Sequence, residues 1–500
     1  MTEEDRIKID KYGARIDCLA ISRERDKLKF LLDEMEQFKN CNEEAKNDAG
    51  FNYYLGTGLG LYSDLLVQSG KQHTDLEVIE LRRTSMFYLR KGLAFYNPTI
   101  HTDPRAQLRI LTNYANGLDT AGRVFEALRI YRRVLDINDQ FSIAYGNYGR
   151  SLQFLANMVN DGGHYKELHC YAYQAIKEAL SIDDPDMHEP ALEAFQKTVD
   201  EYEALPTKDI LAKPIMNKEY KMGDTEEEIE YRKWCLKHHL FLNPLNEVRE
   251  LESAFAHDPL TITRYTEDVH ATDSVSGNQA EPPRWFAMLN QLKEEYIYAR
   301  YLCFEASEKY GDVHFANRDV TLSLASYDYT NYSIRIEQLK SSFRILYSML
   351  DQICFFVNDF WKLGLAEKKA DAYHICKATN YPKDNIALMS LYWVLCEFFE
   401  KYGEADDPSE RELAVLRNAL EHKFVKVHEY DWKRALQLES DSFYHVSEEA
   451  LKNHNMRLLE IAREALMYLV YAISIDESKK NNSQIAVPMQ ITNFIDDWKR

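Results

Sequence analysis

Three residues whose side chains could cut a phosphodiester without a metal lie in one short stretch of the chain. Arg417, Asn418 and His422 fall within the sequence VLRNALEHKFV. A histidine can act as acid or base near neutral pH, because its unperturbed pKa is about 6.5. An arginine holds two phosphate oxygens at once and keeps its charge, and an asparagine can orient the phosphate or the imidazole. This set suits attack of a ribose 2′-hydroxyl on the adjacent phosphate of RNA.

A helix is expected to carry these residues. Residues four apart lie nearly above one another on a helix, so Asn418 and His422 share a face and Arg417 lies one step around. A core stripe with three-four spacing runs along the other side, through Leu413, Leu416, Leu420, Phe424 and Val427. The outward side carries Val415, Ala419 and Val425 where Glu and Lys would be usual. A helix that is apolar on two sides suggests a second partner.

The spacing Arg-x4-His, with asparagine directly after arginine, resembles the signature of HEPN domains, many of which are ribonucleases that act as dimers. The motif lies on the third of four strongly apolar helices expected near the C-terminus. The first, second and fourth begin at about Ile336, Asn385 and Met456, and Ser409 or Asp407 could cap the third. The segments LFLNPLNEV, DPLTITRY and RDVTLSLASYDYTNYSIRIEQLK are similar to the connecting region of a bacterial branch with N-terminal repeats. The resemblance covers roughly residues 220–480 and implies a four-helix bundle.

The resemblance implies that Arg417, Asn418 and His422 are catalytic in a two-fold dimer. One histidine per chain does not supply both an acid and a base, whereas a homodimer joined through the HEPN helices supplies a second. The products would carry 2′,3′-cyclic phosphate ends. Phe424 stands where some HEPN toxins have a tyrosine that a partner enzyme modifies, so control by that modification is not expected. Related proteins are associated with anti-phage defence or stress growth arrest.

Each motif residue also has a simpler explanation. Arg417 could pair with Glu421 four residues later, a surface interaction worth only about 0.3–0.5 kcal/mol. Asn418 and His422 could be solvent-facing helix residues without a role. Asp351 interrupts the first apolar helix, and a buried carboxylate there would need a partner such as Arg417. A surface position for Asp351 is the alternative.

Charge and composition narrow the class of protein. The net charge of −20 argues against a chain coated for nucleic-acid binding. Lys423 and Lys426 belong to a locally positive stretch that could contact RNA, or they could simply end a solvated helix. Eight cysteines without a CxxC pair, and the lack of an apolar leader or membrane span, indicate a cytoplasmic protein. No His/Cys or paired-carboxylate constellation predicts a metal or cofactor.

The N-terminal half contains repetition similar to tetratricopeptide repeats. Small and large apolar residues take the repeat positions in the stretch that starts at Gln107: Tyr114, Ala115, Leu118, Ala127, Tyr131 and Val134. More degenerate units flank it, and three to four repeats can form a solenoid with a concave face. The glycine-rich stretch 56–60 follows no strand and lacks a complete phosphate-loop pattern. Close packing of a repeat helix explains it better.

We therefore predict an all-α protein, with a TPR-like helical solenoid followed by a HEPN four-helix bundle. Five segments are expected: N-terminal helices 1–48, repeats 49–205, a connecting region 206–330 with a polar loop at about 267–283, the HEPN domain 331–480 and a tail 481–500. The predicted function is a metal-independent RNA endonuclease, a toxin or effector whose repeats bind a protein or RNA trigger. The alternative is a non-catalytic interaction protein that binds partner proteins or a nucleotide, which the acidic charge favours.

Overall fold

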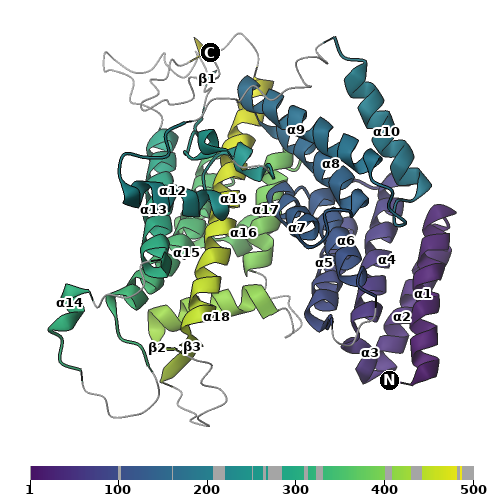
Figure 1. Cartoon of the computed structure of the whole chain (residues 1–500), viewed down its shortest axis with the longest axis horizontal. Coiled ribbons are helices and arrows are strands. Elements are labelled where there is room, and N and C mark those ends of the chain that lie inside the picture. The colour runs from purple at the N-terminus through teal and green to yellow at the C-terminus, as the bar shows by residue number, and fades with distance from the viewer. Residues whose placement is uncertain are drawn as a thin grey trace. The chain divides into compact units, whose positions relative to one another are not determined.

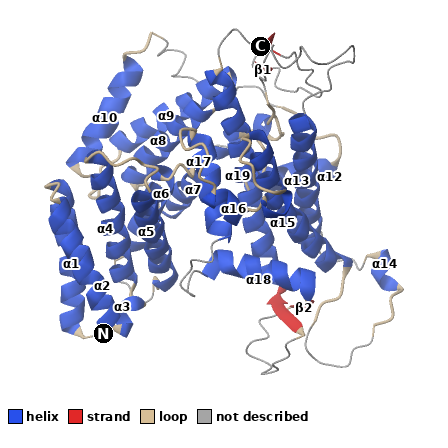
Figure 2. Ribbon diagram, turned by 180° about the vertical axis from the view of Figure 1, so that it is seen from behind, coloured by secondary structure: helices blue, strands red, loops and turns tan. Residues whose placement is uncertain are grey.

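Helices form nearly all of the regular structure in the computed structural model, as Figures 1 and 2 show, and the all-α prediction is confirmed. The structure describes residues 2–98, 103–159, 161–206, 220–249, 252–262, 266–267, 284–308, 314–322, 330–399, 408–429, 442–480 and 485–486. The chain divides into two units: residues 1–215 with Glu247–Arg249, and residues 216–246 with 250–500. Across the described ranges, no helix is long and apolar enough to cross a membrane.

The first unit is a succession of helices in which sequence neighbours pack together. These are α1 (Glu3–Ile21), α2 (Arg25–Cys41), α3 (Glu43–Lys46), α4 (Ala49–Gln68), α5 (Leu76–Phe95), α6 (Ala106–Thr120), α7 (Val124–Ile137), α8 (Ser142–Met158), α9 (Gly162–Ser181) and α10 (Glu189–Glu203). The closest pairs are α4 with α5, α6 with α7, and α8 with α9. All six apolar positions that the repeat pattern singled out in α6 and α7 are buried. Burial of these positions is compatible with the expected repeats, which stay a prediction.

Glycine lets two of these helix pairs approach closely. A Cβ added to Gly56 of α4 would lie 2.9 Å from the carbonyl oxygen of Ser85 on α5. A Cβ added to Gly149 of α8 would lie 2.8 Å from the carbonyl oxygen of Ala172 on α9. Backbone at this distance leaves no room for a methyl group. Gly56 thus serves helix packing, as its position in the sequence suggested.

The second unit contains the long helices of the C-terminal bundle. Its elements are α12 (Glu226–Lys237), β1 (Thr266–Glu267), α13 (Arg284–Glu308), α14 (Phe315–Arg318), α15 (Ile334–Phe360), α16 (Ala372–Lys377), α17 (Ile386–Phe399), α18 (Pro408–His422), β2 (Phe424–His428), β3 (Phe443–Ser447), α19 (Glu448–Lys479) and β4 (Ile485–Ala486). Short 3-10 turns lie at Pro244–Glu247, Ser253–Phe255 and Glu367–Lys369. Helix α13 packs along α15, and both contact α19. Residues 461–474 of α19 are buried on all sides, as their continuous apolar sequence predicts.

One prediction about the motif helix is wrong. Helix α18 ends at His422, so Phe424 and Val427 do not continue its core stripe. They lie in β2, which pairs in parallel with β3. Valines at alternate positions favour a strand, and Val427 is buried while Phe424 is 72% exposed. Residues 268–283 of the expected polar loop lie outside the described residues.

Candidate functional site

Helix α18 is anchored to the bundle by its inner face. Leu413, Leu416 and Leu420 are buried as predicted, and α18 contacts both α15 and α17. The Arg344 guanidinium on α15 donates a hydrogen bond to the carbonyl oxygen of Leu420 over 3.0 Å. This bond satisfies a carbonyl of the last helical turn, which would otherwise have no intrahelical partner. The turn that carries His422 is therefore held in place from α15.

Arg417 lies at the edge of this packed face. Its guanidinium carbon is 5.3 Å from the centre of the Tyr347 ring on α15, and the side chain is partly buried. Its Nη1 donates a hydrogen bond to the Oδ1 of Asn418 over 3.2 Å. Within the described part of the chain, the polar partner of Arg417 is thus Asn418, while the exposed Glu421 forms no ion pair with it. Arg417 and Asn418 are brought together, with a ring beneath the cation.

The outward face of α18 is polar at two positions and apolar at one. Val415, Asn418 and His422 follow the three-four spacing of one helix face, and all three are exposed. Ala419 was expected on this side, but it is only 3% exposed. Its small side chain instead lies on the buried side with the leucines. The face that carries the motif is therefore narrower than the sequence suggested.

Asp351 lies one turn after Tyr347 on α15. It is close enough to Arg417 for the two charges to interact. Burial raises the pKa of Asp351, while the positive charge of Arg417 acts in the opposite direction and Asp371 adds to the rise. Burial and the Asp351 charge raise the pKa of Tyr347 to about 12, so its phenol is neutral. The position of Tyr347 beneath Arg417 was not predicted from the sequence. Its spacing of four from Asp351 was the available signal.

Two histidines near the motif form a pair that was not predicted from the sequence. His428 of β2 and His445 of β3 have ring nitrogens 2.9 Å apart, and their rings are nearly parallel at 15°. One of these nitrogens donates the hydrogen bond and the other accepts it, according to the tautomers of the two rings. His428 is buried and His445 is half-buried. The parallel strand pairing, which no local pattern reveals, brings them together.

The predicted basic residues have unequal access to solvent. Lys423 is exposed directly after α18. Lys426 is partly buried, and its ammonium lies 4.8 Å from the centre of the Phe443 ring. Among the described residues, no group of three or more His, Cys, Asp or Glu side chains could hold a metal ion. Lys423 is therefore the more accessible cation for a phosphate.

Aromatic side chains beside the motif remain exposed to solvent. Phe424 is 72% exposed and Phe443 is 37% exposed, with ring centres 5.8 Å apart across β2 and β3. Val415 on the motif face of α18 is 41% exposed. We call Val415, Phe424 and Phe443 the apolar rim. Large apolar side chains grouped at a surface commonly mark a contact with another protein.

Comparison with known families covers this part of the chain. Residues 276–476 match the model of the LA2681-like HEPN family. The matched range runs from α13 through most of α19, and so contains the whole Arg417–Asn418–His422 group. The match does not extend to the N-terminal helices. No curated protein and no solved structure matches the chain.

Proposed function

Because the chain carries a HEPN domain of the LA2681-like type over residues 276–476, which indicates a nuclease-like or RNA-related role, we propose that it is a metal-independent RNA endonuclease. The observation that carries the proposal is the arrangement on α18. Asn418 and His422 are exposed one turn apart, and Arg417 lies against the Tyr347 ring and donates a hydrogen bond to Asn418. A bundle with a purely structural role has no need of this polar group beside exposed aromatic rings.

The chemistry follows from the three side chains. His422 accepts the proton of a ribose 2′-hydroxyl, whose oxygen forms a bond to the adjacent phosphorus. Arg417 binds the phosphate oxygens on which negative charge develops, and Asn418 orients the phosphate or the imidazole. The bond from phosphorus to the 5′-oxygen breaks, and that oxygen takes a proton from a second acid. The products are a 2′,3′-cyclic phosphate and a 5′-hydroxyl.

A second copy of the chain supplies the second acid. HEPN domains often dimerise and bind RNA, and the apolar rim offers a surface for a homodimer. A two-fold axis near α18 would bring the His422 side chains of both copies to one substrate. One imidazole would then act as base and the other as acid.

The biological setting is part of the same proposal. A cytoplasmic nuclease of this kind would act as a toxin or effector in anti-phage defence or stress growth arrest, held idle until the repeats bind a trigger. A net charge of −20 favours a second candidate, a non-catalytic interaction protein whose bundle only dimerises or binds a nucleotide. The two candidates differ in one expectation: the nuclease cleaves RNA and needs His422 to do so, whereas the non-catalytic protein does not cleave RNA.

The test compares the purified protein with two variants of α18. Total cellular RNA is incubated with the wild type, His422→Ala and Glu421→Ala in excess chelator, and the product ends are mapped. We expect cyclic phosphate ends from the wild type and from Glu421→Ala, which alters an exposed neighbour, and none from His422→Ala. If all three are inert, they are expressed inducibly in cells, where a trigger can be present. Equal growth of all three there would favour the non-catalytic protein.

A further inference from the structure

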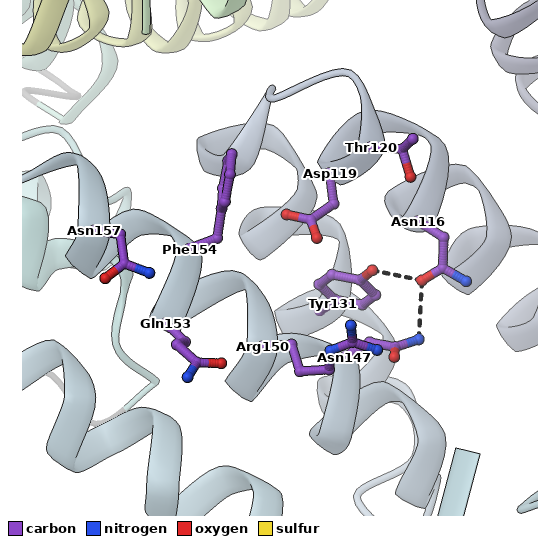
Figure 3. Close-up of a pocket in the computed structure, with 9 residues that line it drawn as sticks. All are labelled: Asn116, Asp119, Thr120, Tyr131, Asn147, Arg150, Gln153, Phe154 and Asn157. Carbon is purple, nitrogen blue, oxygen red and sulfur yellow. Dashed lines mark hydrogen bonds between the residues drawn. The ribbon is translucent and has the colours of Figure 1, made fainter. Parts of the chain in front are cut away.

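A polar pocket lies in the first unit, far along the sequence from the proposed nuclease site. Its volume is about 460 Å³, and residues from α6, α7 and α8 line it (Figure 3). Its lining includes Asn116, Asp119, Tyr131, Asn147, Arg150 and Phe154. Figure 3 shows Asp119, Tyr131 and Arg150 near the middle, with Asn116 and Phe154 on different sides. Three helices thus contribute polar groups to one cavity.

Asp119 brings to this pocket a carboxyl group with one unsatisfied oxygen. Its Oδ1 is buried and accepts no hydrogen bond from the residues that the structure describes. Burial raises the pKa of Asp119 to about 6, against the opposing effects of the Ser151 hydroxyl and the Arg150 charge. Tyr131, whose pKa burial raises far above its usual value, faces it as a neutral phenol. A buried carboxylate oxygen without a hydrogen bond is costly, so Oδ1 of Asp119 would gain from a cation in the pocket.

The two asparagines are oriented by their own hydrogen bonds. The Tyr131 hydroxyl donates to the Oδ1 of Asn116 over 2.6 Å, and the Nδ2 of Asn147 donates to the same oxygen over 2.9 Å. The Oδ1 of Asn116 is thereby used twice, which leaves its Nδ2 as a donor and the Oδ1 of Asn147 as an acceptor. A side-chain donor and acceptor held next to each other match the C=O and N–H of one residue in an extended peptide, because those two groups point to the same side of the chain. An extended segment outside a sheet has both of these backbone groups free.

We propose that this pocket binds an extended basic peptide segment, with a lysine or arginine side chain at Asp119 and its backbone on Asn116 and Asn147. The Phe154 ring can cover the apolar stem of such a side chain. An RNA ligand fits less well, because phosphates need clustered cations and Arg150 shares the pocket with an acid. The acidic chain as a whole also attracts basic partners. The binding does not depend on nuclease activity.

The experiment uses the full chain and a randomised library of twelve-residue peptides. We expect selected peptides to share a lysine or arginine at one position. The best peptide should bind Asp119→Asn at least tenfold more weakly and without the basic preference, as measured by calorimetry. Asp139→Asn removes the same charge from an exposed position outside the lining and should bind like the wild type. Asn147→Ala should weaken binding but keep the basic preference.

A pH series separates this ligand from others. Binding of the best peptide should weaken as the pH falls from 7.5 to 5, because Asp119 gains a proton near pH 6, and the Asp119→Asn variant should lack this change. Selection without a basic preference, or equal binding by Asp119→Asn, overturns the proposal. So does single-stranded RNA that displaces the peptide and binds Asp119→Asn more tightly. If Asp119→Asn does not fold, the Asn147→Ala result and the pH series decide.

Discussion

The position of Arg417 depends on contacts that a lysine could not reproduce. The planar guanidinium lies over the Tyr347 ring and donates to Asn418 from one of its nitrogens. A lysine has no plane to stack and carries its charge at a single nitrogen. We therefore expect Arg417→Lys to lower the rate of RNA cleavage at least tenfold, about 1.4 kcal/mol of transition-state stabilisation, without a change in thermal stability.

Variants of Tyr347, whose ring lies beneath Arg417, are the controls for this prediction. Tyr347→Phe keeps the ring face and should retain most of the activity, because the phenol is neutral and contributes no charge. Tyr347→Leu removes the aromatic ring face, and this variant should lose activity to the same extent as Arg417→Lys. Full cleavage by Arg417→Lys would show that Arg417 acts only as a diffuse positive charge.

Asp351 is expected to limit stability and to support the site. Burial raises its pKa in the folded protein, so the folded state binds a proton more readily than the unfolded state. This contribution to stability is present at low pH and is lost as the pH rises from the unfolded value of 3.8 through the higher folded value. Asp351→Asn should therefore raise the melting temperature at pH 7 and flatten its decline above pH 4. Activity that falls in the same variant would indicate that the carboxylate positions Arg417.

At the scale of the helices, the close crossing of α8 and α9 makes a clear prediction. In Gly149→Ala the new methyl group would meet the carbonyl of Ala172, and the two helices would have to separate. We expect a loss of about 1–3 kcal/mol in the free energy of unfolding, measured with urea. Gly162→Ala, also in a helix but with no atom within 4 Å of the added Cβ, should be neutral or stabilising. Equal stability of both variants would mean that α8 can shift without cost.

The same scale shows what a sequence can and cannot reveal here. Three-four spacing located the long helices and the buried leucines of α18, since local periodicity reports directly on which side is buried. It did not predict that α18 ends at His422, because β2 is completed only by β3, beyond residues 430–441. The contact of Tyr347 with Arg417 and the pocket around Asp119 likewise join residues from different helices. Such long-range pairings leave no periodic trace in one chain.

For the whole molecule, charge and the apolar rim have opposite effects on self-association. A net charge of −20 on each copy repels a second copy, whereas burial of Phe424 and Phe443 favours contact. Added salt screens the repulsion, so the dimer should become tighter with salt while RNA binding weakens. Light scattering and RNA binding measured over one salt series should show these opposite slopes. Parallel slopes would mean that the copies associate through charged groups instead of the rim.

The proposed dimer can be linked to catalysis by changing one exposed ring at a time. Phe424→Glu puts a charge into the apolar rim and should give a monomer with little activity, although His422 is intact. Phe315→Glu changes a ring on α14 that is equally exposed, 71% against 72%, and should remain an active dimer.

A mixing experiment then tests whether two copies share one catalytic site. With an excess of His422→Ala protein, most wild-type chains pair with a copy that lacks the histidine, so activity per wild-type chain should fall. Chains that cut RNA singly would keep their activity at any mixing ratio, and the proposed two-histidine site would then be wrong.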